Sequence, residues 1–232
     1  MTDILEFKLI SFAICPFVQR SRILLNTKEI PYEIDYIDLE NKPEWFLKRV
    51  PTGKVPALFM GDETLFESAV INEFLDEVTP GSILPDTPLA RAKDRAWISL
   101  SDGLIMSQFR MMIAPDIDSS KKELAALAKG LLQFADIASA RATATDMTLL
   151  DAAITPVFMR LYVVPDILAA LEAQLSDAPQ ILAWAKRLMA LEAVKTSVSP
   201  AFSDEFIAYF ANRGSLIAKA MLEGKELAFE DA

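Results

Sequence analysis

The chain has 232 residues and a mass of 25.7 kDa, which suits one large or two small domains with an ordinary hydrophobic core. It contains no histidine and one cysteine, Cys15. A Ser-His-Asp triad, a histidine-ligated metal and an internal disulfide are therefore excluded, and no metal site is expected. The net charge is -10, and the longest basic run is Lys121-Lys122, so a nucleic-acid partner is not expected.

Three features concern location. The opening Met1-Thr2-Asp3 does not resemble the start of a secretory signal. The most apolar stretch, 149–164, is interrupted by charged residues and a proline, so it is not expected to span or enter a membrane. A single thiol fits a reducing compartment. Together these features predict a soluble cytoplasmic protein.

The first 80 residues alternate short apolar runs with helical patterns. The predicted elements are a strand at 5–10, a helix at 16–28, a strand at 32–37, a helical turn at 43–48, a hairpin of strands at 57–60 and 64–66, and an amphipathic helix to 78 with Ser68 as its N-cap. This order predicts a compact α/β domain over residues 1–79.

Residues 80–88 carry three prolines and one of the seven glycines, which is typical of a linker. The remainder, 89–232, is predicted to be an all-helical domain. Its helices are expected at 89–113, 119–141, 148–163, 166–175, 179–191 and 203–223. Trp184 should be a core residue, and Thr148 with Asp151 should form a reciprocal helix cap rather than a reactive pair.

Cys15 is the main candidate for chemistry. It follows the first predicted strand and precedes Pro16, a residue suited to the first position of a helix. There the N–H groups of Phe17 and Val18 and the helix dipole would favour a thiolate, and Arg20 and Arg22 would add positive potential. The alternative is that Cys15 is a small buried hydrophobic residue, and its position alone does not decide between the two.

Several motifs together resemble the glutathione transferases, most closely their cysteine-type omega class. The matching segments are Cys-Pro-Phe-Val-Gln-Arg-Ser-Arg at 15–22, Asn-Lys-Pro-Glu-Trp-Phe at 41–46, Val-Pro at 55–56, Glu-Ser at 67–68 and Phe-Leu-Asp-Glu at 74–77. The resemblance implies the glutathione transferase fold, a thioredoxin-like α/β domain followed by an all-α domain. The first predicted strand begins within about five residues, so no role of the N-terminal extension typical of the class is carried over.

The resemblance also implies a glutathione site. Its expected members are Cys15 as the catalytic residue, Phe17, Lys42, Val55, Glu67 and Ser68 as glutathione-binding residues, and Pro56 as a structural cis-proline. The chemistry of these residues fits glutathione. Glu67 can bind the γ-glutamyl ammonium, Ser68 its carboxylate and Lys42 the glycyl carboxylate, while the Val55 backbone can pair with the cysteinyl part as an added strand does.

The implied function is a glutathione-dependent thiol transferase or reductase of the dehydroascorbate reductase type. Glutathione serves as co-substrate, the second substrate is a small electrophile or disulfide, and the protein is expected to be a homodimer. One alternative is conjugation of glutathione to electrophiles, for which Ser11 lies nearby. Another is a non-enzymatic regulator on the same scaffold, similar to the stringent starvation proteins. Membrane insertion, as in the related intracellular chloride channel proteins, is a more remote alternative.

Overall fold

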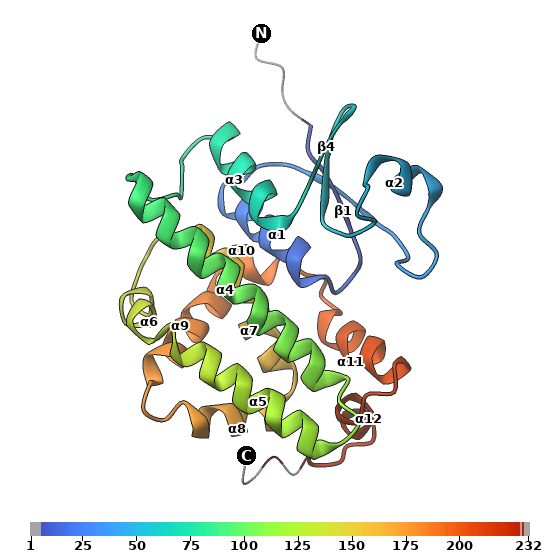
Figure 1. Cartoon of the computed structure of the whole chain (residues 1–232), viewed down its shortest axis with the longest axis vertical. Helices are drawn as coiled ribbons and strands as arrows, with labels where there is room; N and C mark the ends of the chain where they lie inside the picture. Colours follow the sequence, from blue (N-terminus) through green and yellow to red (C-terminus); the bar gives the residue numbers. More distant parts are fainter. Residues whose placement is uncertain (1–5, 228, 230–232) are drawn as a thin grey trace. The chain divides into compact units, whose positions relative to one another are not determined.

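The computed structural model describes residues 6–227 and 229. The first elements follow the predicted order, β1, α1, β2, α2, β3, β4 and α3, and helices follow them (Figure 1). The predicted first strand begins at Leu5, which lies outside the described residues. The bounds are β1 Lys8–Ser11, α1 Pro16–Thr27, β2 Glu33–Tyr36, α2 Glu44–Arg49, β3 Ala57–Met60, β4 Glu63–Phe66 and α3 Ser68–Val78.

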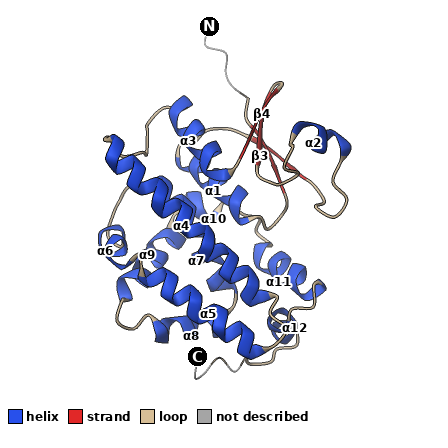
Figure 2. Cartoon of the chain, viewed as in Figure 1, coloured by secondary structure: helices blue, strands red, loops and turns tan. Residues whose placement is uncertain are grey.

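Helices make up the regular structure of the later part of the chain that is described (Figure 2). Their bounds are α4 Pro88–Met112, α5 Ile117–Leu132, α6 Ala135–Arg141, α7 Leu149–Val163, α8 Pro165–Gln174, α9 Pro179–Ala190, α10 Glu192–Lys195, α11 Phe202–Asn212 and α12 Leu216–Leu222. The predicted class, an α/β part followed by an all-α part, is confirmed.

The described strands form one sheet in the order β2-β1-β3-β4. The β1–β2 pair is parallel, whereas β1–β3 and β3–β4 are antiparallel. One face of the sheet carries a buried cluster with α2, formed by Ile10, Ile37, Phe46, Val50, Ala57 and Phe59. Leu9 and Leu58 point to the opposite face because side chains alternate along a strand, and α1 and α3 cover that face (Figure 1).

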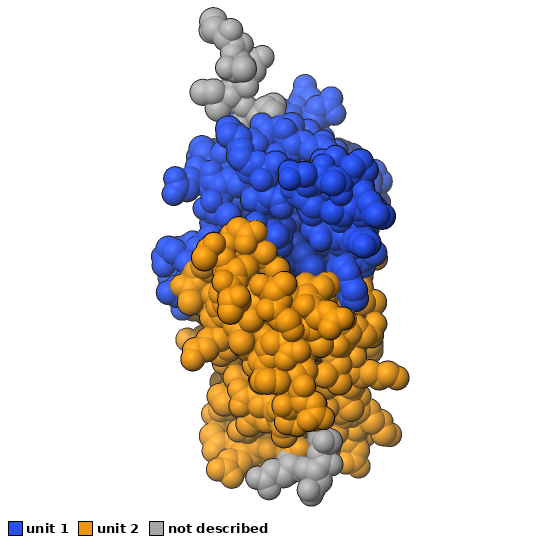
Figure 3. All heavy atoms as spheres, turned by 90° about the vertical axis from the view of Figure 1, so that its left-hand side faces the viewer, with its two compact units in different colours: residues 1–98, 147–153, 192–200 blue, residues 99–146, 154–191, 201–232 orange. Residues whose placement is uncertain are grey.

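The contacts divide the chain into two compact units (Figure 3). The first contains residues 1–98, 147–153 and 192–200, and the second contains 99–146, 154–191 and 201–232. The first unit thus gathers segments that are distant in sequence, including α10 and the first turn of α7. The domains predicted from sequence, 1–79 and 89–232 joined by 80–88, stay a prediction about which parts fold on their own.

Trp184 of α9 is a core residue of the second unit, as predicted, with none of its surface exposed. Its ring packs against Phe158 of α7 at a centroid distance of 5.6 Å and against Phe134 at 6.5 Å. A second aromatic group lies along α11, where the ring centroids of Phe206 and Phe210 are 4.8 Å apart. Aromatic side chains bury large apolar areas, so these groups contribute much of the packing within this unit.

Two of the predicted long helices are wrong because each is divided. The helix predicted at 119–141 breaks at Gln133 and Phe134, where the N–H of Phe134 bonds back to Leu131 and its ring is fully buried against Trp184. Burial of this ring outweighs the continuous helical pattern. The helix predicted at 203–223 breaks at Gly214, whose φ of 86° is a left-handed conformation that glycine adopts readily.

The start of α7 confirms the predicted reciprocal cap. The N–H of Thr148 donates to Asp151 Oδ2 at 3.0 Å, and the N–H of Asp151 donates to Thr148 Oγ1 at 3.1 Å.

Within the described residues, no single helix is both long and apolar enough to cross a membrane. The pair α7 and α8, bent by 117° at their junction, meets that length and composition test only when taken together.

A buried ion pair joins α1 to the end of α3. Lys28 Nζ lies 2.8 Å from Asp76 Oδ1, and the two side chains are 3% and 0% exposed. Lys28 also donates to the carbonyls of Asp76 and Thr79 at the end of the helix, where backbone acceptors lack helical partners. Burial alone would raise the pKa of Asp76, but hydrogen bonds from Lys28, Ser82 and Ile83 outweigh it and hold that pKa below its ordinary value of 3.8.

Asp76→Asn should lower the free energy of unfolding at pH 7 by about 3–5 kcal/mol, because it leaves the Lys28 ammonium buried without its carboxylate. Since the pKa of Asp76 is lower in the folded protein, its stabilisation is present above pH 3.8 and is lost as the pH falls below that value. Urea unfolding at pH 7 and at a series of acidic pH values measures both effects.

Glu73→Gln on the same helix is the matched control. Its partner Arg95 is half exposed, and the pair should contribute less than about 1 kcal/mol. An equal loss of stability in the two variants, or a loss in Asp76→Asn that does not diminish in acid, would contradict the assignment of Lys28–Asp76 as a stabilising pair.

Candidate functional site

The strand register brings the expected site segments to one end of the sheet. Ser11, the last residue of β1, lies opposite Tyr36, the last residue of β2. Ala57, the first residue of β3, lies opposite both Ile10 and Phe66, near the ends of β1 and β4. The segments that follow β1, β2 and β4 and the segment that precedes β3 therefore meet at this end. They contain Cys15, Lys42, Glu67–Ser68 and Val55–Pro56, respectively.

Cys15 occupies the N-cap position of α1, with Pro16 as the first helical residue, as the sequence predicts. Its N–H donates to the carbonyl of Phe12 at 3.0 Å, which closes a turn after β1. Its own carbonyl accepts the first helical hydrogen bond, from Gln19, at 3.2 Å. The side chain of Cys15 therefore starts at the N-terminus of a twelve-residue helix, where backbone N–H groups and the helix dipole favour negative charge.

Two observations bear on the thiol of Cys15. The residue is 6% exposed, so most of its surface is covered by its neighbours. No acidic residue lies in the first turn of α1, so no carboxylate of that turn opposes a negative charge at its N-terminus. Burial disfavours a thiolate, whereas the helix N-terminus favours it. Phe17, in the first turn, is partly exposed beside Cys15 in the sequence.

The Val55–Pro56 peptide bond is cis, the geometry that the resemblance implies. The Val55 side chain packs against the core cluster under α2. In residues 6–227 and 229, neither the N–H nor the C=O of Val55 has a hydrogen-bond partner. Exposed Lys42 reaches the same loop, since its Nζ lies 3.7 Å from the position that a Cβ on Gly53 would take.

Glu67 and Ser68 form the turn from β4 into α3. The structure corrects one prediction here, because Glu67 is the N-cap and Ser68 is the first helical residue. Glu67 is exposed and has φ 72° and ψ 116°, an unusual conformation for a residue with a Cβ. Ser68 is buried, and its hydroxyl is not engaged as an N-cap. Conformations of this kind cost about 1–3 kcal/mol and concentrate at functional sites.

Arg20 is buried, which the sequence did not predict. Its guanidinium, 1% exposed, donates from Nη1 to Ser68 Oγ at 3.3 Å and from Nε to the carbonyl of Ala153 at 2.9 Å. From the sequence, Arg20 was expected only to add positive potential at Cys15. Its burial could not be foreseen, because arginine is mostly exposed and the partner segment, 147–153, is distant in sequence.

Other polar residues of α1 bind the segment 192–200, which includes the unpredicted α10. Gln19 Nε2 donates to Ser197 Oγ at 3.1 Å, and both residues are buried. Arg22 donates to the hydroxyls of Tyr32 and Tyr36 and to the carbonyl of Thr196. The guanidinium of Arg22 therefore links α1 by hydrogen bonds to the β2 region and to residues 192–200.

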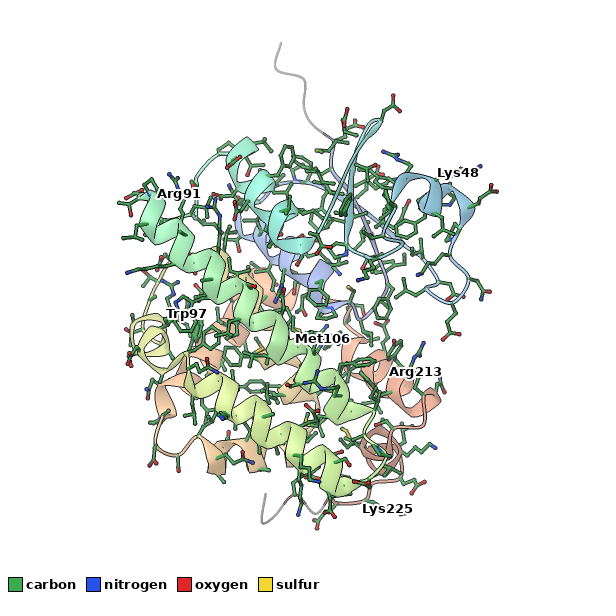
Figure 4. The ribbon with its side chains drawn as sticks, viewed as in Figure 1. Lys48, Arg91, Trp97, Met106, Arg213 and Lys225 are labelled. Carbon is green, nitrogen blue, oxygen red and sulfur yellow. The ribbon has the colours of Figure 1, made fainter. Side chains whose placement is uncertain are left out.

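Ser11 and the methionines of α4 have ordinary structural environments. The Ser11 hydroxyl is buried and donates to the carbonyl of Phe12 at 2.9 Å, so its proton is already used. Along α4, Met111 and Met112 are 1% exposed and belong to the core of the second unit. Met106 on the same helix is 43% exposed (Figure 4).

Comparison with known proteins identifies a matching family model and several relatives. Residues 14–78 match a family model described as the N-terminal domain of glutathione S-transferase. One relative is the pyrimidodiazepine synthase of Drosophila melanogaster, 37% identical over 126 residues, or 51% of this chain and 52% of the relative. Another is glutathione S-transferase omega-1 of Sus scrofa, 38% identical over 119 residues, or 49% of each chain. The chain spans about half the length of these curated relatives.

The fold extends the similarity to 90% of the chain. Glutathione transferase Omega 3C from Trametes versicolor superimposes with a TM-score of 0.74 at 25% identity, covering 90% of this chain and 91% of that one. The resemblance to the glutathione S-transferases, with the omega class among the relatives, is confirmed, as is the glutathione transferase fold.

Glu67→Gly should raise the free energy of unfolding by about 1 kcal/mol relative to Glu67→Gln. Both variants lose the carboxylate, but only glycine removes the Cβ that opposes a φ of 72°. Glutamine is the matched control because it keeps the size of the side chain and the strain. Chemical unfolding of both variants measures the difference, and equal stabilities would show that the conformation costs nothing.

Proposed function

We propose that this chain, whose residues 14–78 match a model of the glutathione S-transferase N-terminal domain, is a glutathione-dependent thiol transferase with Cys15 as its nucleophile. The observation that carries the proposal is the position of Cys15 at the N-terminus of α1. This is the end of the sheet where Val55 and Glu67–Ser68 also lie. The thiol and the groups suited to a peptide ligand therefore lie at the same end of the sheet, within one compact unit.

Each charged or polar part of glutathione has a suitable group at this end of the sheet. The Val55 backbone, whose N–H and C=O have no hydrogen-bond partner among the described residues, can pair with the cysteinyl part in the manner of an added strand. Exposed Glu67 suits the γ-glutamyl ammonium, and Ser68 at the start of α3 suits the adjacent carboxylate. Lys42, which reaches over the Gly53 loop, suits the glycyl carboxylate. Phe17 supplies apolar contact beside the thiol.

The reaction consists of two thiol–disulfide exchanges. In the first, the Cys15 thiolate attacks the glutathione sulfur of a mixed disulfide, the S–S bond breaks, and the second substrate leaves as a thiolate that takes up a proton. In the second, the thiolate of another glutathione attacks the Cys15–glutathione disulfide, which releases oxidised glutathione and restores the Cys15 thiolate. The resolving thiol comes from outside the chain, because Cys15 is its single cysteine.

The environment of Cys15 supports exchange chemistry more than conjugation. Conjugation requires a hydroxyl that donates to the glutathione thiolate, and the Ser11 hydroxyl donates to Phe12 instead. A thiol at a helix N-terminus is itself a nucleophile, because that position favours the thiolate. A purely regulatory protein on this scaffold would have no need of Glu67 in a strained conformation at the start of α3.

The wider proposal includes a homodimeric assembly and two other kinds of second substrate. Dehydroascorbate would be reduced by two electrons while two glutathiones become oxidised glutathione. A glutathione adduct of an aromatic or acyl compound would transfer its glutathione sulfur to Cys15, with the C–S bond breaking and the carbon group leaving as a carbanion that takes up a proton. A reducing, cytoplasmic compartment suits the chemistry, because it supplies reduced glutathione and keeps a lone thiol reduced. These parts rest on the family resemblance and on the single cysteine.

Treatment of the native protein with oxidised glutathione should add one glutathione, at Cys15, because the exchange forms a mixed disulfide there. Intact-protein and peptide mass spectrometry measure the adduct, and reduced glutathione should remove it. Cys15→Ser is the control and should gain no adduct. Wild-type protein that stays unmodified under native conditions, but reacts after unfolding, would overturn the proposal by showing that the covered thiol is inaccessible.

Lys42→Ala should raise KM for glutathione about tenfold with little change in kcat, because it removes a charge-assisted contact to the glycyl carboxylate. Lys54→Ala, another exposed lysine in the loop that precedes β3, is the matched control and should change neither constant appreciably. Steady-state kinetics with varied glutathione distinguish the two. An equal effect of both variants would indicate only general attraction of anionic glutathione.

A further inference from the structure

Arg20 is a buried cation placed directly behind the start of α3. It lies on α1, one turn beyond Cys15, and is 1% exposed. Its Nη1 donates to Ser68 Oγ at 3.3 Å, and Ser68 is itself 6% exposed. An arginine remains charged at any ordinary pH, so this contact places a permanent positive charge next to the hydroxyl of Ser68.

The direction of this hydrogen bond determines what the Ser68 hydroxyl can do. A serine hydroxyl has one proton to donate and two lone pairs that accept. Because Arg20 donates to the oxygen, one lone pair is used, and the hydroxyl proton is directed away from the guanidinium. A hydroxyl arranged in this way is a donor suited to a carboxylate, and the adjacent positive charge strengthens such a bond.

A second hydrogen bond joins Arg20 to α7. Its Nε donates to the carbonyl of Ala153 at 2.9 Å, in the first half of α7. The first turn of α7 is closed by the reciprocal Thr148 and Asp151 hydrogen bonds. These two hydrogen-bond partners of the guanidinium lie on α3 and α7 within the same compact unit, and the guanidinium carbon also lies 5.1 Å from the ring centroid of Phe17 on α1. A planar guanidinium presents two separate nitrogens, Nε and Nη1, to these partners in a fixed geometry, whereas the three N–H donors of a lysine ammonium share a single nitrogen.

We infer that Arg20 is a positioning residue that makes the Ser68 subsite selective for the α-carboxylate of the γ-glutamyl group. This inference rests on the proposed glutathione-dependent function and adds to it a residue that acts through Ser68. Arg20 contributes by fixing the donor direction of the Ser68 hydroxyl and by supplying a buried positive charge. Loss of this arrangement should therefore affect one group of the ligand and leave the remainder of the tripeptide site intact.

The test compares two ligands, glutathione and 4-aminobutyryl-cysteinylglycine, which keeps the ammonium but lacks the γ-glutamyl carboxylate. Calorimetric titration gives their Kd ratio for each protein. Wild-type protein should bind glutathione at least about tenfold more tightly than the analogue, since a hydrogen-bonded charge is lost. Arg20→Lys should weaken glutathione binding about tenfold and change analogue binding less than about twofold, so that the ratio collapses.

Two further variants complete the design. Ser68→Ala should reduce the same Kd ratio, and its effect should not add to that of Arg20→Lys, because both remove one shared interaction. Arg22→Lys is the matched control, an arginine on the same helix whose partners are Tyr32, Tyr36 and Thr196, and it should leave the ratio unchanged. Thermal unfolding of each protein reports folding independently of ligand.

The possible outcomes separate this inference from the proposed function. If wild-type protein does not bind glutathione, the proposed function fails and the inference fails with it. If wild-type protein binds but Arg20→Lys leaves the Kd ratio unchanged, or weakens both ligands equally, Arg20 is structural and only the inference is overturned. Arg20→Gln is the second variant in case Arg20→Lys does not fold, and failure of both to fold would also assign Arg20 a purely structural role.

Discussion

The pairing of β3 with both β1 and β4 is the constraint on which the candidate site depends. Because Ala57 is registered against Ile10 on one side and Phe66 on the other, the segments around Val55, Cys15 and Glu67 meet at one end of the sheet. A shift of one residue would turn every strand side chain to the opposite face and separate the buried clusters from their helices. The same register thus organises both the core and the site.

Helix α1 connects this end of the sheet to the rest of its unit. Cys15 is its N-cap, Arg20 donates a hydrogen bond to Ser68, and Lys28 at its C-cap forms an ion pair with Asp76 of α3. Polar contacts at such depth are costly unless they are satisfied, and here each is directed at a defined partner. The helix that presents the thiol is therefore held by interactions along its length, which limits its freedom to move relative to α3.

The sequence predicted the regular elements of the first part well because its signals there are local. Pro16 predicts the start of α1, and the periodic apolar residues after Ser68 predict α3. The breaks at Phe134 and Gly214 and the short helix α10 were not predicted. The break at Phe134 depends on the contact of its ring with Trp184, fifty residues further along the chain, and no local sequence pattern encodes that contact. The Thr148–Asp151 cap was predictable because both partners lie within one helical turn.

The sequence by itself determined the residue types available for chemistry: one thiol, no imidazole, and a set of charged and hydroxyl groups at the spacing of a known family. It also determined that Cys15 begins a helix, since proline after it favours that position. Only the tertiary structure decided that Arg20 is buried against Ser68 and Ala153, and that Arg22, two residues later, has different partners. The physical reason is that burial and hydrogen-bond direction depend on segments separated by many residues, which the chain brings together only when its sheet and helices have packed.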